Sequence, residues 1–395
     1  MLQGKHILII VENLPVPFDR RVWQEANTLK DEGAYVSIIC PKMKGYNKSF
    51  ERINNIDIYR HPLPLEASGA LGYLLEYSVA LFWEYFLSLK IFLKKRFEVI
   101  QGCNPPDLIF IVALFYKLFG VKYVFDHHDI NPELYIAKYN KKGIFYKFML
   151  LAERLTFKTA NYSIATNQSY KEIAIQRGKM PAQNVQVVRS GPKLDRLTPG
   201  EGNKIYKKGR KFLVGYVGVI GEQEGLDLLL EAAKFITKER NDVQFAIIGD
   251  GTELPKIKTS TVEMGLNEFV DFYGRVDDKT MVDILNTADV CVNPDKPTEM
   301  NNLSTMNKIM EYMALKKPIV QFDLKEGKLS AQEASLYAKN TSTEDFADKI
   351  VWLLEHPEAR IRMGIFGYER IINDLSWKHE SEKLINLYNT IFKGK

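Results

Sequence analysis

The chain has 395 residues, and with 46% hydrophobic and 26% charged residues it has the composition of a globular protein with a sizeable interior. This length exceeds one ordinary hydrophobic core, so we expect two domains. The formal net charge is only +5, which does not indicate a nucleic-acid partner.

Three cysteines, Cys40, Cys103 and Cys291, lie far apart and lack metal-ligand spacing. Such sparse use is typical of a reducing cytoplasm, where each thiol acts as a small buried hydrophobic group. The first apolar run is too short for a signal peptide, and acidic and turn residues follow it instead of a cleavage site. We therefore expect a cytoplasmic protein that begins with a strand at His6–Val11.

Apolar runs alternate with helical patterns along the whole chain, which predicts an α/β fold with parallel sheets. In the first half we expect a helix at Arg20–Glu32. The further strands expected there are Tyr35–Cys40, Ile56–Arg60, Val99–Gly102, Lys122–Asp126, Ser163–Thr166 and Val185–Val188. The most hydrophobic window, residues 70–93, contains Glu76, Glu84 and Lys90. Charges are costly in the middle of a bilayer, so we do not expect a transmembrane span.

The segment LTPGEGNKIYKKGRK is rich in Gly and Lys and is interpreted as a linker or exposed excursion. It places a boundary near residue 198, between a domain of residues 1–197 and a domain of residues 198–376. The second domain is expected to contain strands in KFLVGYVG, VQFAIIGDG, VDFYGRV, DVCVNP and Pro318–Phe322, and helices at Asp227–Lys238 and Thr305–Ala314. Residues 377–395 are amphipathic and predict a helix that either covers a sheet edge or packs back on the first domain.

In open α/β sheets, ligands bind beyond the carboxyl ends of the strands. After the first strand, Asp19 can cap the next helix, and Arg20 and Arg21 stand in its first turn, where cations oppose the helix dipole. Either both arginines are solvated, or at least one contacts a phosphate or an acceptor.

The strand KYVFD is followed by His127, His128 and Asp129. Adjacent histidines point to opposite sides of a strand, so a shared metal site is disfavoured. We expect one histidine to hold a ligand hydroxyl, with Asp129 as its orienting partner or as a helix cap. A purely structural histidine beside a cap is the alternative.

Glycines mark the ends of three strands in the second half. Such residues let the backbone approach a ligand closely, or simply permit tight turns. The residues concerned are Gly218, Gly221, Gly225, Gly249, Gly251 and Gly274, and Arg275 follows the last of them.

The stretch NLSTMNKIMEYMA begins a helix at a strand end. With Ser304 or Thr305 as N-cap, the amides of Thr305, Met306 and Asn307 would receive a diphosphate, assisted by Lys308. Glu311, one turn later, would accept the two hydroxyls of a ribose. The alternative is an intrahelical ion pair between Lys308 and Glu311, worth less than about 0.5 kcal/mol.

These segments together resemble a known family. NKIMEYMALKKPIV after DVCVNP, with YVGVIGEQEGLDLLLEAAKFI, FAIIGDG, VDFYGRV and VWQEANTLKDEGAYVSIICP in matching order, resembles the retaining glycosyltransferases of family 4, which have the GT-B fold. The resemblance covers essentially the whole chain and is to the bacterial branch that builds capsular, exopolysaccharide or O-antigen repeats. It implies two Rossmann-like, doubly wound α/β domains facing across a cleft, the first binding the acceptor and the second a nucleotide-diphosphate sugar.

By this resemblance, Glu311 matches the ribose-binding Glu of the family and His128 matches the histidine that contacts the transferred sugar. The first Glu of the Glu-x7-Glu motif falls on Leu303, so Ser304, Glu299 or a loop backbone must replace it. The family's Arg and Lys at the diphosphate fall on Val219 and Glu224.

Because a leaving nucleoside diphosphate gains negative charge, the missing cations must be replaced. We expect Lys308, Arg20 or Arg21 and the helix amides to do so.

The leading interpretation is a metal-independent hexosyl- or N-acetylhexosaminyltransferase with a UDP-linked donor, no cofactor and no covalent enzyme nucleophile. The donor phosphate would accept the acceptor proton. The alternatives are a nucleotide-sugar-binding scaffold subunit, favoured by Leu303 and the missing cations, and a UDP-sugar epimerase of the same fold. Aromatic and basic residues interleave in YFLSLKIFLKKRF and YNKKGIFYKFMLLAERLTFK, which favours peripheral contact with the inner membrane face and a polyprenyl-diphosphate-linked or glycan acceptor.

Overall fold

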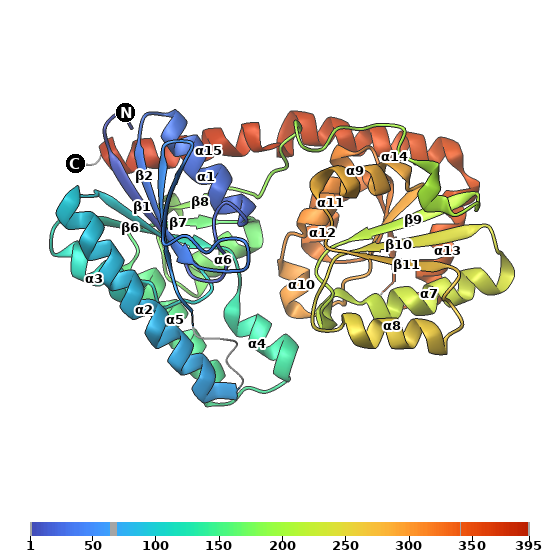
Figure 1. The fold of residues 1–395 in the computed structure, drawn as a ribbon, viewed down its shortest axis with the longest axis horizontal. Coiled ribbons are helices and arrows are strands. Elements are labelled where there is room, and N and C mark those ends of the chain that lie inside the picture. The colour runs from blue at the N-terminus through green and yellow to red at the C-terminus, as the bar shows by residue number, and fades with distance from the viewer. Residues whose placement is uncertain (1, 64–68, 340, 394–395) are drawn as a thin grey trace. The chain divides into compact units, whose positions relative to one another are not determined.

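The computed structural model describes residues 2–63, 69–339 and 341–393 of the chain. It divides into two compact units, of which the first comprises residues 1–190 and 380–395 and the second comprises residues 191–379. Each unit is an α/β body with its own twisted sheet and helices on both faces (Figure 1). The boundary predicted near residue 198 lies inside the second unit, which begins at Gly191.

The sheet of the first unit has eight strands in the order β3-β4-β2-β1-β5-β6-β7-β8. They are β1 (His6–Val11), β2 (Tyr35–Pro41), β3 (Phe50–Ile53), β4 (Ile56–His61), β5 (Val99–Cys103), β6 (Lys122–His127), β7 (Tyr162–Ala165) and β8 (Val185–Val187). All neighbours pair in parallel except β3 and β4, which pair antiparallel. The predicted strands are confirmed. The edge strand β3 was not predicted, because its residues are exposed or half-buried and carry no hydrophobic signal.

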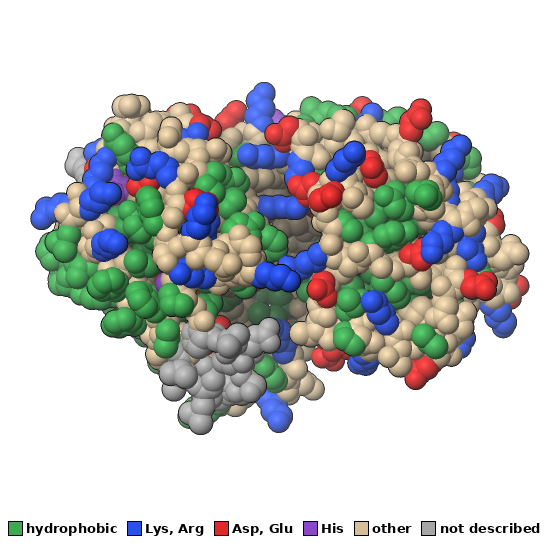
Figure 2. Space-filling view, viewed as in Figure 1, with side chains coloured by type: hydrophobic (Ala, Val, Ile, Leu, Met, Phe, Trp, Pro, Cys, Tyr) green, Lys and Arg blue, Asp and Glu red, His purple; other side chains and the backbone are tan. Residues whose placement is uncertain are grey.

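The helices of the first unit cover both faces of this sheet (Figure 1). They are α1 (Arg20–Asp31), α2 (Gly69–Lys94), α3 (Phe110–Lys117), α4 (Asn131–Tyr139), α5 (Ile144–Thr159), α6 (Gln168–Gln176) and, from residue 380 onward, α15 (Trp377–Lys393). Within the described ranges, no helix is both long and apolar enough to cross a membrane. Exposed hydrophobic side chains gather over α2 and α3 (Figure 2).

The sheet of the second unit has six parallel strands in the order β11-β10-β9-β12-β13-β14. They are β9 (Phe212–Val217), β10 (Val243–Ile248), β11 (Val270–Gly274), β12 (Val290–Asn293), β13 (Ile319–Phe322) and β14 (Ser335–Ala338). The helices are α7 (Leu226–Glu239), α8 (Leu254–Glu263), α9 (Asp278–Thr287), α10 (Glu299–Leu303), α11 (Asn307–Ala314), α12 (Lys325–Ala331), α13 (Thr343–Glu355) and α14 (Pro357–Arg370). The two Rossmann-like bodies confirm the predicted fold class.

Both faces of the second sheet are buried, which explains why its strands read as continuous apolar runs. Val214 and Tyr216 of β9 pack in one core with α7 and α13, whereas Leu213 packs in the other with α9 and α11.

The predicted linker segment is largely exposed but is tied to the second unit. Leu197 is fully buried in its core, and the Asn203 amide donates to Thr287 Oγ1 of α9 at 2.7 Å.

Candidate active site

Glycines bring the carboxyl ends of β9, β10 and β11 together. The Gly218 amide donates to the Ile248 carbonyl at 3.0 Å, and the Gly249 amide donates to the Gly274 carbonyl at 2.9 Å. A Cβ on Gly249 would lie 1.8 Å from the Gly218 carbonyl oxygen, and its φ is +141°. The backbones approach so closely that only glycine fits at position 249.

Gly251 and Gly274 have different roles in these turns. A Cβ on Gly251 would lie 2.3 Å from a backbone carbonyl oxygen of the loop after β9. At Gly274 the φ of +65° requires glycine, but a Cβ there would meet no described atom within 4 Å. The exposed side chain of Arg275 follows directly. Close packing therefore accounts for glycine at 249 and 251, while the space beside Gly274 is open.

The start of α11 differs from the sequence prediction. The N-cap is Met306, not Ser304 or Thr305, and its side chain makes no capping hydrogen bond. Ser304 is the C-cap of α10, with extended backbone angles of φ −96° and ψ 140°, and Met306 is also extended, with φ −84° and ψ 113°. The helix therefore begins two residues later than expected, at Asn307.

This late start leaves helix donors unsatisfied. The Ile309 amide donates to the Met306 carbonyl at 3.1 Å. Among the described residues, the amides of Asn307 and Lys308 have no hydrogen-bond acceptor. These two amides are the first two of the helix and lie at the positive end of its dipole.

Lys308 reaches from α11 to the end of β9. Its Nζ lies 2.8 Å from Asp295 Oδ1 and 4.9 Å from the centre of the Tyr216 ring. A Cβ on Gly218 would lie 3.2 Å from Lys308 Cε, so glycine at 218 leaves room for the lysine stem. Burial raises the pKa of Asp295, and the positive charge of Lys308 opposes that rise.

Glu224 lies in the same cluster. The Lys296 amide donates to the Gln223 carbonyl at 3.0 Å, and a Cβ on Gly225, at φ +65°, would lie 2.0 Å from the Pro294 carbonyl oxygen. The loop before α7 and the loop after β12 are thus joined, which places Glu224 beside Asp295.

Burial raises the pKa of Glu224, the charge of Asp295 adds to the rise, and Lys308 opposes it. A Cβ on Gly221 would lie 2.6 Å from Glu224 Oε2, so the carboxylate folds back over its own loop. By contrast, Val219 is 58% exposed. At the two positions where the family has cations, this chain has an exposed apolar side chain and an inward carboxylate.

Glu311 is held by a residue that the sequence analysis did not identify. Arg196 forms ion pairs with Glu311 and, at 3.2 Å, with Asp278. The alternative intrahelical pair is not what the structure shows, because Lys308 pairs with Asp295. Asp295 could have been found from the sequence, since it directly follows the strand DVCVNP; Arg196 carried no comparable signal.

In the first unit, the two histidines after β6 point to opposite faces, as expected. His127 is buried among Phe125, Phe157 and Tyr170, and burial lowers its pKa to about 3. It is a structural residue. His128 is the histidine that is partly exposed, with 13% of its side-chain surface accessible.

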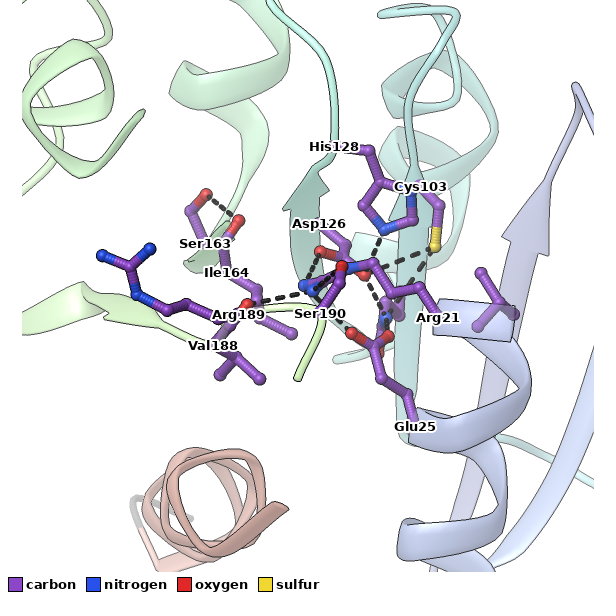
Figure 3. Close-up of polar contacts among 12 residues, drawn as sticks. Arg21, Glu25, Cys103, Asp126, His128, Ser163, Ile164, Val188, Arg189 and Ser190 are labelled. Carbon is purple, nitrogen blue, oxygen red and sulfur yellow. Dashed lines mark hydrogen bonds and ion pairs between the residues drawn. The ribbon is translucent and has the colours of Figure 1, made fainter. Parts of the chain in front are cut away.

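The predicted partner of His128 was wrong. Its Nε2 lies 2.8 Å from Asp126 Oδ2 (Figure 3). The orienting carboxylate is therefore that of Asp126, the next-to-last residue of β6, and not that of Asp129. Asp129 is not the helix cap either, because α4 has Ile130 as its N-cap. The Asn104 side chain accepts from the amides of His128 and Asp129 at 2.6 Å and 3.2 Å and fixes this turn.

A buried polar network surrounds Asp126 (Figure 3). Arg21 contacts Asp126 at 2.9 Å and Glu25 at 3.0 Å, and donates to the Val188 carbonyl at 2.9 Å. Burial alone would raise the pKa of Asp126, but Arg21 and His128 hold it below its ordinary value. The same carboxylate raises the pKa of His128 against the opposing effect of burial.

This network also fixes the C-terminal helix. Gln101 of β5 donates to Glu25 at 2.6 Å and to Asp126 at 2.8 Å, and its carbonyl accepts from the Tyr388 hydroxyl of α15 at 2.5 Å. Arg21 is therefore structural, whereas Arg20 is exposed at the first residue of α1. Asp19 caps this helix by accepting from the Val22 amide at 3.0 Å, as predicted.

Cys103, Asp126 and His128 place their polar atoms within 4.8 Å of one another, the spacing of a metal site. The chemistry does not favour one here. Asp126 is already engaged by Arg21 and His128, and burial raises the pKa of Cys103 well above its usual range, so the thiol stays protonated.

Comparisons with known proteins agree with this architecture. Residues 19–196 match the family model described as Glycosyltransferase Family 4, and residues 211–356 match the model described as Glycosyl transferases group 1. The chain is similar to a poly(ribitol-phosphate) alpha-N-acetylglucosaminyltransferase of Staphylococcus aureus (strain COL), with 28% identity over 186 residues, or 45% of this chain. The match spans only 35% of that protein's length.

Two further similarities cover more of the chain. The capsular polysaccharide biosynthesis glycosyltransferase CapM of Staphylococcus aureus is 24% identical over 332 residues, 80% of this chain and 83% of that protein. The crystal structure of Anabaena Alr3699/HepE in complex with UDP-glucose has a TM-score of 0.74 at 14% identity and covers 98% of this chain and 99% of that one. This structural likeness establishes the fold.

The pairing of Asp126 with His128 can be tested by titration. We expect Asp126→Asn to bring the pKa of His128 below its ordinary value of 6.5, because burial continues to lower it while the opposing charge is gone. Nuclear magnetic resonance of the histidine ring protons, assigned with His128→Gln, measures this value. Asp129→Asn is the matched control and should leave the pKa of His128 above 6.5. A His128 pKa that stays above 6.5 in Asp126→Asn contradicts the assignment.

Proposed function

The chain belongs to glycosyltransferase family 4, and we propose that it transfers a sugar from a UDP-linked donor to a glycan or polyprenyl-diphosphate-linked acceptor, with retention of the anomeric configuration. The second unit binds the donor, and the first unit binds the acceptor. In this proposal the reaction belongs to the synthesis of a cell-surface polysaccharide. The similarity to enzymes named for poly(ribitol-phosphate) and for capsular polysaccharide biosynthesis supports this assignment.

The observation that carries the proposal is the uncapped start of α11. The amides of Asn307 and Lys308 lack acceptors within the described structure, and the ammonium of Lys308, in the same first turn, pairs with Asp295. Unsatisfied helix amides and the positive end of the dipole together form a binding site for phosphate groups. The same donors would stabilise the negative charge that develops on the leaving nucleoside diphosphate.

In this proposal Glu311 accepts the hydroxyls of the ribose. The carboxylate lies one turn beyond Lys308, and Arg196 holds it in place from outside the helix. Support for a uridine nucleotide comes from the structural similarity to the Anabaena protein, which was crystallised with UDP-glucose.

The first unit contributes His128 as a donor to a sugar hydroxyl. Asp126 keeps its ring oriented, and Asn104 fixes its backbone. The donor phosphate accepts the proton of the acceptor hydroxyl, and no covalent enzyme nucleophile takes part.

A single backbone amide tests the phosphate site. Asn307→Pro removes one free N–H at the first helical position, where proline is tolerated, and Met306 already has the extended backbone that precedes proline. Asn307→Ala is the control, because it removes the same side chain and keeps the amide. We expect Asn307→Pro to bind UDP about 10- to 100-fold more weakly than Asn307→Ala, the value of one hydrogen bond to a charged group.

Isothermal titration calorimetry with UDP, GDP and ADP gives these affinities. Equal UDP affinity in the two variants would contradict the assignment of the phosphate site to this helix start. Tight binding by the unmodified chain without donor hydrolysis or transfer would instead favour a nucleotide-sugar-binding subunit.

The first unit also has a surface suited to a membrane-bound acceptor. Exposed hydrophobic side chains lie on α2 and α5 and just after α3, among them Phe86, Leu93, Leu118, Phe119, Ile144 and Phe148. The part of this surface over α2 and α3 is seen in Figure 2. A tilted ring contact of Phe92 with Phe119 and an edge-on contact of Tyr85 with Phe115 join α2 to α3 and the residues just after it. Exposed Lys94, Lys95 and Arg96 follow at the end of α2. An apolar surface bordered by cations is typical of peripheral contact with anionic lipid.

Membrane contact predicts a position-dependent effect of new charges. Leu93 and Leu118 are 78% and 82% exposed, so Leu93→Glu with Leu118→Glu should not disturb the core. We expect this double variant to bind vesicles containing phosphatidylglycerol at least about tenfold more weakly, since both side chains lose apolar burial and gain repulsion. Ile205→Glu, at a 70% exposed site in the second unit, is the control. Equal cosedimentation of all three proteins with vesicles would exclude this surface.

A further inference from the structure

An exposed apolar stripe runs along α14, on the outside of the second unit (Figure 1), and into the π-helical turn Ile371–Leu375 that follows it. Ile361, Ile365 and Ile372 are 64%, 45% and 40% exposed, and Tyr368 between the last two is half-buried. These side chains follow one another at intervals of four, three and four residues. Such spacing places them on one face of a helix and is the spacing of the contact positions of a coiled coil.

The opposite face of α14 fixes the helix on the second unit. A Cβ on Gly364 would lie 2.2 Å from the Lys316 carbonyl oxygen, and a Cβ on Gly367 would lie 3.1 Å from Met313 Cγ of α11. Ile371, directly after α14, is fully buried in the same core as α11. Because the helix is held by this inner face, its outer apolar stripe is a rigid surface that is available to another molecule.

Two charges of opposite sign stand on one flank of the stripe. Arg362 and Glu369 are exposed, and neither forms an ion pair or a hydrogen bond within the described part of the chain. They are seven residues apart, about 10 Å along the helix axis, which is too far for them to pair with each other. Glu358, one turn before Arg362, does not pair with it either. The flank therefore offers one cation and one anion to a partner.

A second copy of α14 in antiparallel orientation complements the stripe and its charges together. A two-fold axis that passes between residues 366 and 367 would place Ile361 against Ile372 of the second copy and Ile365 against Tyr368 of the second copy. The same axis brings Arg362 of each copy to Glu369 of the other. In a parallel pair, each charge would instead stand level with the identical charge of the second copy.

We propose that the chain forms a two-fold symmetric dimer in which α14 packs antiparallel against α14 of a second copy. Anionic lipid is a poorer occupant, because it would need a flank of cations and would be repelled by Glu369. A stripe of four side chains is small beside the standard interface of about 1,600 Å², so the dimer is expected to be weak and to depend on concentration. This inference does not rest on the proposed function, since the stripe contains no residue of either candidate site.

Sedimentation velocity of the full chain over a range of concentrations tests the dimer. We expect the dimer fraction to rise with concentration, and Ile365→Glu to raise the dissociation constant at least about tenfold, because it buries a carboxylate from each copy near the two-fold axis. Val262→Glu, at a 61% exposed position of α8 in the same unit, is the matched control and should leave the dissociation constant unchanged. Thermal melts show whether each variant is folded.

A charge exchange tests the antiparallel arrangement. Arg362→Glu and Glu369→Arg, each alone, should weaken self-association by about threefold or more, since like charges then face each other twice in the dimer. An equimolar mixture of these two variants should dimerise as tightly as the unmodified chain, because every facing pair is again of opposite sign. The double variant Arg362→Glu with Glu369→Arg should also regain the original dissociation constant.

Four results would overturn the proposal. The first is a chain that stays monomeric at every concentration. The second is a dimer whose dissociation constant is unchanged by Ile365→Glu, which would place the interface on another surface. The third is a mixture of the two charge variants that associates no better than either alone. The fourth is a monomer whose binding to phosphatidylglycerol vesicles is lost in Ile365→Glu, which would show that lipid covers the stripe.

Discussion

The proposed donor site depends on one local feature: α10 ends at Leu303, and α11 begins only at Asn307. Serine and threonine are good N-cap residues, so Ser304 and Thr305 were expected to begin this helix. In the structure Ser304 is instead the C-cap of the preceding short helix. Met306 then occupies the N-cap without a polar side chain, and within the described part of the chain the amides of Asn307 and Lys308 have no hydrogen-bond acceptor. Lys308 and Glu311, fixed by Asp295 and Arg196, surround this helix start with charges. The uncapped start of α11 is thus the basis of the proposed phosphate site.

The first unit follows a different principle, in which a buried polar network supports the partly exposed His128. Asp126 is bound by Arg21, Gln101 and His128, and Gln101 in turn is bound by Tyr388 of the last helix. A buried carboxylate costs free energy unless it is paired, and here every neighbour contributes to that pairing. Three successive contacts therefore link the last helix to His128: Tyr388 with Gln101, Gln101 with Asp126, and Asp126 with His128.

Much of the fold could be predicted from the sequence, because parallel strands buried on both faces give clear apolar runs. β3 gave no such signal, since its four residues are not buried. The residue types after each strand predicted the candidate positions: the glycines, Lys308 and Glu311 lie at strand and helix ends of the second unit, and His128 lies directly after β6 in the first. The partners were not predictable in the same way. Asp126 rather than Asp129 orients His128, and Arg196 lies 115 residues before Glu311, so only the tertiary structure brings them together.

The central claim is that a diphosphate binds to the start of α11. A crystal structure of the chain with UDP tests it most directly. The account predicts phosphate oxygens at the amides of Asn307 and Lys308 and the ribose hydroxyls at Glu311. A nucleotide bound elsewhere, with these two amides still free or occupied by the protein's own side chains, would contradict it.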